Sequence, residues 1–205
     1  MYIVMEYCQG KTLWDRLEIK GTFTERETAQ LIYKIIEGLN HVHASDVVHR
    51  DIKPENIIVD DHGDPKIIDF GLSKDTKENT RILKSFVGSK IYMAPEILGG
   101  SVYSETCDMW SIGIICWVML TADYPFSSRN LDHDIINAPI FFQRQAWQGV
   151  GDSCKDLILK LLDRDDLARI KSSGAINHPW FNEVLKDDKD FLAEHNMFPC
   201  NDGSH

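Results

Sequence analysis

The sequence predicts an α+β fold that is predominantly helical and carries short β-hairpins. Segments 24–43 and 104–120 repeat apolar residues at helical spacing, and 152–162 is amphipathic in the same way. The apolar runs 57–59 and 66–68 flank a turn rich in Asp and Gly, which predicts a hairpin of two short strands. A chain of 205 residues with 43% hydrophobic and 26% charged residues can bury a sizeable core around these elements.

The chain begins with a short apolar segment, Tyr2–Met5, which favours a β-strand, and Glu6–Gly10 ends it. The next residues, Gly10–Thr12, imitate the end of a Walker A phosphate loop. That loop requires an earlier glycine where this chain has Met5, and the strand–loop–helix context is missing as well. We therefore exclude a phosphate loop of this type.

A capping box formed by Thr24 and Glu27 marks the start of the first long helix, which should run to about His43. The apolar residues that face the core recur three and four residues apart: Leu31, Ile32, Ile35, Ile36, Leu39 and Val42. His41 and His43 fall in the last turn, where histidine can interact with terminal carbonyl groups. No third ligand candidate is nearby, so we do not expect a metal site there.

An ordered loop with the sequence HRDIKPEN, residues 49–56, follows this helix. Pro54 fixes its own φ and disfavours helix for the residue before it, so the segment should not be helical. The predicted hairpin then returns the chain and should place Asp69 beside Asn56.

These residues could support phosphoryl transfer, which depends on positioning and charge stabilisation. Asn56 and Asp69 offer the oxygen ligands that Mg²⁺ takes when phosphates supply its other ligands. Lys53 can neutralise a transferring phosphoryl group, and Asp51 can orient a hydroxyl and accept its proton. The alternative is a solvated turn with scattered charges, and the combined spacing of both motifs argues against it.

The segment 72–93 is charged and irregular and contains Thr76, Thr80, Ser85 and Ser89. A loop of this length without structure of its own is usually functional or mobile. Ser104 should cap the next helix, which runs to Leu120 and is apolar on most faces, so that it should be fully buried. Asp108 within it is either a buried charge or an exposed acid in the first turn.

The C-terminal part contains weaker signals. A helix in 135–147 should be short, because Pro139 interrupts it. The tail from Glu183 mixes charged residues with scattered aromatic ones, and we expect it to pack loosely or to be disordered.

Charge and cysteine content exclude several classes of protein. The formal net charge is −10 and no basic stripe is present, so nucleic-acid and membrane partners are not expected. The 5 cysteines are widely spread without a CxxC pair, which argues against a disulfide framework or a zinc site. The most apolar run, 109–120, is too short to span a membrane, and no signal peptide opens the chain. We expect a cytoplasmic or nuclear protein.

The three motifs HRDIKPEN, DFG at 69–71 and APE at 94–96 resemble those of eukaryotic protein kinases. Lys53 in the first motif, and Gly88 and Ser89 before the third, resemble the serine/threonine branch. The run DFGLSK and the His178-Pro179-Trp180 ending are most similar to calcium/calmodulin-regulated and calcium-dependent protein kinases. The resemblance spans 2–181 and implies the helical large lobe of a kinase.

The resemblance implies an enzyme that transfers the γ-phosphate of ATP, with Mg²⁺, to serine or threonine in proteins. Asp51 and Lys53 would be catalytic, and Asn56 and Asp69 would hold the metal. The nucleotide would contact a set of residues around the cleft: Glu6, Cys8, Lys53, Glu55, Asn56, Ile58 and Asp69. Glu55 would also be an acidic contact for the substrate, which implies basic residues near its target.

Several further roles follow from the same resemblance. Asp108 would accept backbone N–H bonds from the catalytic loop, and Glu96 would pair with Arg169. His49 and Phe70 would pack against the loop and align it. We expect the regulatory residues to be a phosphate-binding Arg50, Lys74 as a second cation, an activating phosphosite at Ser85, and Ser89 at the substrate contact.

The resemblance divides the chain into a last small-lobe strand and hinge (1–14), the large lobe (15–182) and a tail (183–205). The catalytic loop would be 49–56 and the activation segment 69–96. No glycine-rich loop or V-A-I-K lysine precedes residue 2, so the chain alone should be a poor kinase. It could pair with a separate small lobe or a regulatory segment, or be a non-catalytic kinase-derived scaffold. At Lys11 and Thr12 relatives carry Gly and an acid that binds ribose.

Overall fold

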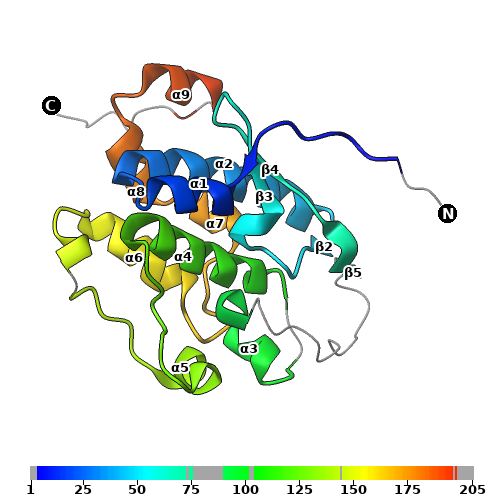
Figure 1. Cartoon of the computed structure of the whole chain (residues 1–205), viewed down its shortest axis with the longest axis vertical. Helices are drawn as coiled ribbons and strands as arrows, with labels where there is room; N and C mark the ends of the chain where they lie inside the picture. Colours follow the sequence, from blue (N-terminus) through cyan, green and yellow to red (C-terminus); the bar gives the residue numbers. More distant parts are fainter. Residues whose placement is uncertain are drawn as a thin grey trace, which may run out of the picture.

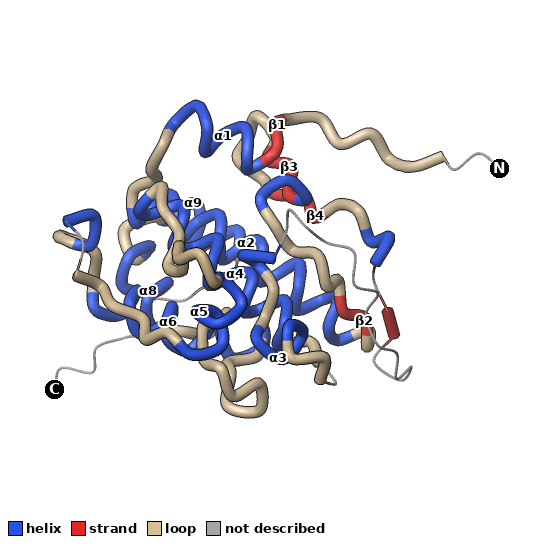
Figure 2. Tube along the Cα trace, turned by 60° about the horizontal axis from the view of Figure 1, so that its bottom comes forward, coloured by secondary structure: helices blue, strands red, loops and turns tan. Residues whose placement is uncertain are grey.

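The computed structural model describes residues 4–72, 74–75, 90–101, 104–143, 145–195 and 197, without the side chains of residues 72, 74 and 75. Helices form most of the described part, and a small sheet lies on one side of them (Figures 1 and 2). The α+β, predominantly helical class predicted from the sequence is confirmed.

Two long helices cross the centre of the molecule. Helix α2, Glu25–Ala44, begins at the predicted Thr24 capping box, and helix α4 spans Thr106–Thr121. Every residue of α4 from Thr106 to Leu120 is buried, as its apolar sequence predicts. Its N-cap is Glu105 rather than the predicted Ser104, and the Glu105 side chain makes no capping hydrogen bond. Ser104 Oγ lies 2.7 Å from the Thr106 hydroxyl and also accepts the Thr106 N–H at 3.4 Å, so its side chain still bonds the first residue of the helix.

The remaining helices surround this pair. Helix α6 confirms the amphipathic prediction, and α8 and α6 pack against α2 and α4 respectively. The other helices are short, and α5 ends before Pro139 as predicted. Their bounds are α1 Leu13–Lys20, α3 Pro95–Leu98, α5 Leu131–Asn137, α6 Asp152–Leu161, α7 Ser172–Ala175, α8 Pro179–Leu185 and α9 Lys189–Glu194. Short 3₁₀ turns lie at Pro54–Asn56, Phe70–Leu72, Lys90–Tyr92 and Gln145–Trp147.

The predicted hairpin is present as strands β3 and β4, which span Ile57–Val59 and Pro65–Ile67. Strand β1, Lys11–Thr12, adds antiparallel to β3 and completes a three-stranded sheet in the order β1-β3-β4. Gly10 comes so close to β3 that a Cβ atom there would lie 2.5 Å from the Val59 carbonyl oxygen. A second, two-stranded sheet joins β2, Val47–Val48, to β5, Lys74–Asp75.

The strand predicted at Tyr2–Met5 is not seen in its described part. Val4 and Met5 form no strand, and their exposed fractions are 97% and 81%. A β-prone sequence forms a strand only where a partner supplies hydrogen bonds, and the sheet described here begins at Lys11. Figure 1 shows this arm leaving the body of the molecule.

The tail packs more firmly than its sequence predicts. Helix α9 is capped by Asp188, whose carboxylate also accepts a hydrogen bond from Gln30 of α2 at 2.7 Å. Phe191 and Leu192 are buried, and Phe191 makes an edge contact with Tyr33. The expectation of a loose tail is therefore wrong as far as Glu194. In the described residues, no helix is long and apolar enough to cross a membrane.

Candidate active site

The β3–β4 hairpin brings the two predicted metal-binding residues to one place. The Ile68 N–H donates to the Asn56 carbonyl at 2.9 Å, so Asp69 follows directly beside the end of the catalytic loop. Asp69 is exposed and adopts a φ of 61°, and its Oδ1 accepts the Gly71 N–H at 3.2 Å. The geometry agrees with the prediction that the turn would return Asp69 to Asn56.

Three side chains of the catalytic loop form one hydrogen-bonded group. Lys53 Nζ lies 2.7 Å from Asp51 Oδ2, and Asn56 Nδ2 donates to the same oxygen at 3.0 Å. Asn56 Nδ2 also donates to the Asp51 carbonyl at 2.8 Å. Both donors converge on Oδ2. Within the described residues Oδ1 accepts no hydrogen bond, which leaves it available to a substrate hydroxyl.

Buried Asp108 in α4 holds the backbone of this loop. Its Oδ2 accepts the His49 N–H at 2.9 Å, and its Oδ1 accepts the Arg50 N–H at 2.8 Å. The side chain is 1% exposed, so the carboxylate is a buried charge rather than an exposed first-turn acid. These are the contacts that the resemblance implies, and they fix the loop to the most buried helix of the molecule.

His43 supports Asp108 from the end of α2, a contact that sequence reasoning missed. Its Nε2 lies 2.9 Å from Asp108 Oδ2, and its Nδ1 lies 3.1 Å from the Ser172 hydroxyl of α7. The sequence placed His43 against terminal carbonyls, but the buried carboxylate takes that place. Its burial could have been inferred from its register with Leu39 and Ile36 on the core face of α2.

Two residues of the candidate site, one in the catalytic loop and one in the DFG segment, have strained backbones. Arg50 has a φ of 69° and Asp69 a φ of 61°, both in the left-handed region that non-glycine residues rarely occupy. Each such residue costs of the order of 1–3 kcal/mol and persists only where its surroundings enforce it. For Arg50 the enforcing contact is the hydrogen bond from its N–H to Asp108.

His49 and Phe70 pack together as the resemblance implies. Their rings meet edge-on with centroids 4.7 Å apart, and His49 Nε2 lies 3.0 Å from the Ile68 carbonyl oxygen. His49 is fully buried, whereas Phe70 remains 43% exposed. The contact joins the catalytic loop to the DFG segment.

Glu96 and Arg169 form a buried bidentate ion pair. Arg169 Nη1 and Nη2 donate to the two carboxylate oxygens at 2.7 and 2.8 Å, and the side chains are 0% and 6% exposed. Arg169 also donates to the carbonyls of Thr106 and Asp163. The pair thus links the APE segment to the start of α4.

The oxygen donors suit a magnesium–phosphate complex rather than a self-sufficient metal site. Asn56 uses its Nδ2 within the loop, which leaves its Oδ1 as a ligand, and Asp69 contributes a carboxylate. In the described part of the chain, no group of three or more His, Cys, Asp or Glu could hold a metal ion. Phosphate oxygens and water would therefore have to complete the coordination.

The other residues that were predicted to contact the nucleotide are not part of the hydrogen-bonded catalytic group. Glu6 is exposed and its carboxylate pairs with Lys66 at 2.5 Å, and this hydrogen bond lowers the pKa of Glu6. Cys8 and Ile58 are half-buried, and Glu55 is exposed. Their contacts with a nucleotide stay predictions.

Thr12 has a local role that the sequence analysis did not identify. It caps α1: its hydroxyl accepts the Asp15 N–H at 3.1 Å, and Asp15 Oδ2 accepts the Thr12 N–H at 3.0 Å. The hydroxyl of Thr12 also donates to Asp15, which lowers the pKa of that carboxyl. The spacing of Thr12 and Asp15 is a capping-box signal that could have been found in the sequence.

The structure describes only some of the predicted regulatory residues. Ser85 and Ser89 lie outside the described residues, as do Thr76 and Thr80. Lys74 pairs through its backbone with Val48 in the β2–β5 sheet. Their regulatory roles, and that of Arg50, stay predictions.

Comparison with known proteins identifies the family. The model of the protein kinase domain matches residues 1–181. The chain belongs to the protein kinase family. This kinase chain is 36% identical over 186 residues to myosin light chain kinase A of Dictyostelium discoideum, an alignment that covers 88% of the chain and 63% of that protein.

Two further relatives are named for calcium regulation. The chain is 38% identical over 189 residues to calcium-dependent protein kinase 2 of Oryza sativa subsp. japonica, covering 89% of the chain and 36% of the relative. It is 37% identical over 188 residues to calcium/calmodulin-dependent protein kinase type 1 of Caenorhabditis elegans, covering 89% and 53%. The kinase chain therefore spans between about a third and two thirds of the length of these relatives.

Proposed function

We propose that this domain transfers the γ-phosphate of ATP to serine and threonine hydroxyls of protein substrates. The observation that carries the proposal is the group Asp51–Lys53–Asn56, held through the loop backbone by buried Asp108. The serine/threonine assignment is supported by Lys53 within HRDIKPEN and by a relative from Homo sapiens that is named serine/threonine-protein kinase H1.

The chain's own residues divide the work of such a transfer. Asp51 orients the substrate hydroxyl through Oδ1, which accepts no hydrogen bond from the described residues, and takes the proton as the new bond forms. Lys53 Nζ lies 2.7 Å from Asp51 Oδ2, and its ammonium group would stabilise negative charge on the phosphoryl group during the transfer. Mg²⁺ bound with ATP supplies charge neutralisation, and Asn56 and Asp69 are the residues that would hold it.

Substrate preference and location belong to the same proposal. The exposed Glu55 carboxylate lies near the end of the catalytic loop and suits a basic residue near the target hydroxyl. Location in the cytoplasm or nucleus is part of the proposal and rests on the sequence alone.

The test uses the chain joined at its N-terminus to a kinase small lobe. Labelled ATP and arrayed basic peptides with a single Ser, Thr or Tyr acceptor would be assayed with Mg²⁺. We expect label on Ser and Thr and almost none on Tyr. Asp187→Asn, an exposed carboxylate-to-amide change, serves as the matched control and should not alter transfer.

Transfer to Tyr alone would refute the acceptor assignment. No transfer to any peptide or to protein substrates, by a folded protein, would refute the catalytic proposal and favour a kinase-derived scaffold.

A further inference from the structure

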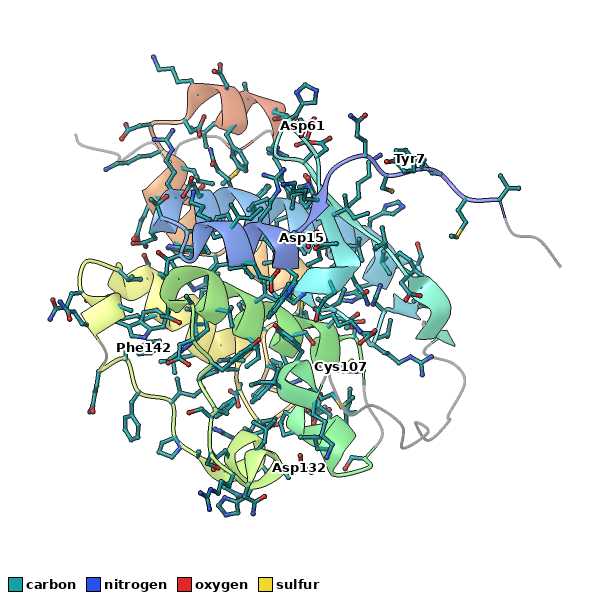
Figure 3. The ribbon with its side chains drawn as sticks, in the orientation of Figure 1. Tyr7, Asp15, Asp61, Cys107, Asp132 and Phe142 are labelled. Carbon is teal, nitrogen blue, oxygen red and sulfur yellow. The ribbon has the colours of Figure 1, made fainter. Side chains whose placement is uncertain are left out.

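A groove lies between α1, α2, the β3–β4 turn and α9, and its volume is about 580 Å³. None of the residues assigned to the candidate active site lines it. Figure 1 shows α9 above α1 and α2, with the β3–β4 turn rising towards α9. Asp61, labelled in Figure 3, stands in this turn at the edge of the groove.

The inner surface of the groove is apolar. Leu31 of α2 and Phe191 of α9 are buried, with exposed fractions of 8% and 6%, and Phe23 is partly buried against the same core. Ile19 of α1 stands on the rim and is 71% exposed. An exposed isoleucine at the edge of an apolar surface is suited to contact an apolar side chain of a ligand.

The rim is positively charged although the protein carries a net charge of −10. Lys11, Arg16, Lys20 and Lys34 line the groove, against two carboxylates. Lys20 pairs with Glu27, and Lys34 pairs with Asp64 outside the groove.

Two of these cations have no carboxylate partner in the described part of the chain. Arg16 donates from Nη2 to the carbonyls of Val59 and Asp60 at 2.8 and 2.7 Å. The Lys11 side chain is exposed and makes no hydrogen bond or ion pair within the described residues, and its charge acts on Asp15 only at longer range. Their charges are therefore not neutralised by a direct ion pair.

We propose that this groove docks a short acidic segment of a protein partner, with apolar side chains between its carboxylates. The apolar side chains would cover Ile19, Phe23 and Leu31, and the carboxylates would face Lys11 and Arg16. Charge complementarity favours this occupant, because a basic segment would meet four cations at the rim. The proposal is independent of catalysis.

The probe is a short fluorescein-labelled peptide of glutamate and leucine, measured by fluorescence anisotropy with the whole chain. Matched peptides replace leucine with serine, or glutamate with lysine. We expect only the glutamate–leucine peptide to bind, with an affinity that falls as salt rises.

Two rim variants test the position of the probe, since both side chains are exposed and neither belongs to the catalytic group. Lys11→Glu and Ile19→Ser should each weaken binding by about fivefold or more, which corresponds to about 1 kcal/mol. The controls are Leu167→Ser, at a side chain that is 91% exposed elsewhere, and Arg129→Glu, an exposed charge next to α5. Both controls should bind as the parent does.

Several outcomes would overturn the proposal. These are no binding of the probe, equal binding of the leucine-free or lysine peptide, and equal effects of rim and control variants. Light scattering that shows a dimer abolished by Lys11→Glu would assign the groove to a second copy of the chain instead, and would also overturn it.

Discussion

Replacing Arg169 by leucine should strongly destabilise the domain. The guanidinium makes two hydrogen bonds to Glu96, at 2.7 and 2.8 Å, and donates to the Thr106 and Asp163 carbonyls at 3.0 and 2.7 Å. Leucine removes all four bonds and leaves the Glu96 carboxylate, only 6% exposed, without a side-chain partner among the described residues.

The expected loss follows from the uncompensated charge. Breaking a buried ion pair by removing one partner costs about 3–5 kcal/mol. For a domain of this size each kcal/mol lowers Tm by roughly 2–4 °C, so the total should be roughly 6–20 °C. Desolvation of Glu96, rather than the lost Coulomb attraction alone, dominates this figure.

Thermal and urea unfolding, followed by circular dichroism, measure the effect. Lys171→Leu is the matched control, because its ion pair with Glu105 at 3.0 Å is exposed, with side chains 63% and 24% accessible. It should change stability by less than about 1 kcal/mol. The double variant Glu96→Leu/Arg169→Leu should recover part of the loss, since no buried charge remains. An Arg169→Leu melting curve that matches the parent would refute the reasoning.

Three other predictions concern the loop, the thiols and the phosphosite. Asp108→Asn should destabilise the domain by about 1.5–3 kcal/mol in urea unfolding, because an amide cannot accept both backbone N–H bonds; unchanged stability would contradict this. Burial raises the pKa of Cys107, and both a hydrogen bond with a neighbouring thiol and burial raise the pKa of Cys154. At pH 8 an aromatic disulfide reagent should therefore modify half-buried Cys8 far faster than Cys107 or Cys154. Equal modification rates at the three thiols, measured by peptide mass spectrometry, would refute this prediction. Ser85→Ala, in the form with a small lobe, should lower turnover, and equal turnover with no phosphate mapped at Ser85 in the active parent would end that idea.

Elements with a strong local pattern could be predicted from the sequence. Helix α2 has both a capping box and a sustained apolar face, and Thr24 is its N-cap as expected. The β3–β4 hairpin has a turn signal between two apolar runs, and it fixed the proximity of Asp69 and Asn56. Each of these signals lies within a few residues, so no distant contact is needed to interpret it.

Contacts between distant residues were anticipated only where the family resemblance supplied them, as for Glu96 and Arg169, and other features that depend on distant partners were missed or wrong. His43 bonds Asp108, 65 residues away, and local sequence does not state which residue faces a histidine across the core. Helix α9 has 6 residues, which is fewer than two turns. A helix this short is stabilised by tertiary contacts, such as the packing of Phe191 on Tyr33, rather than by intrinsic helix propensity. The strand predicted at Tyr2–Met5 is not seen in its described residues, Val4 and Met5, for the opposite reason: β-propensity was present, but no described strand pairs with them.

The most direct test of the central claim is single-turnover phosphoryl transfer by Asp51→Asn, in the form joined to a small lobe. The change keeps the volume and removes the proton acceptor, so the rate should fall about 10²–10⁴-fold. Tm and ATP affinity should remain close to those of the parent, which separates the chemical step from folding and binding. A variant that transfers phosphate at the parental rate would contradict the role assigned to Asp51.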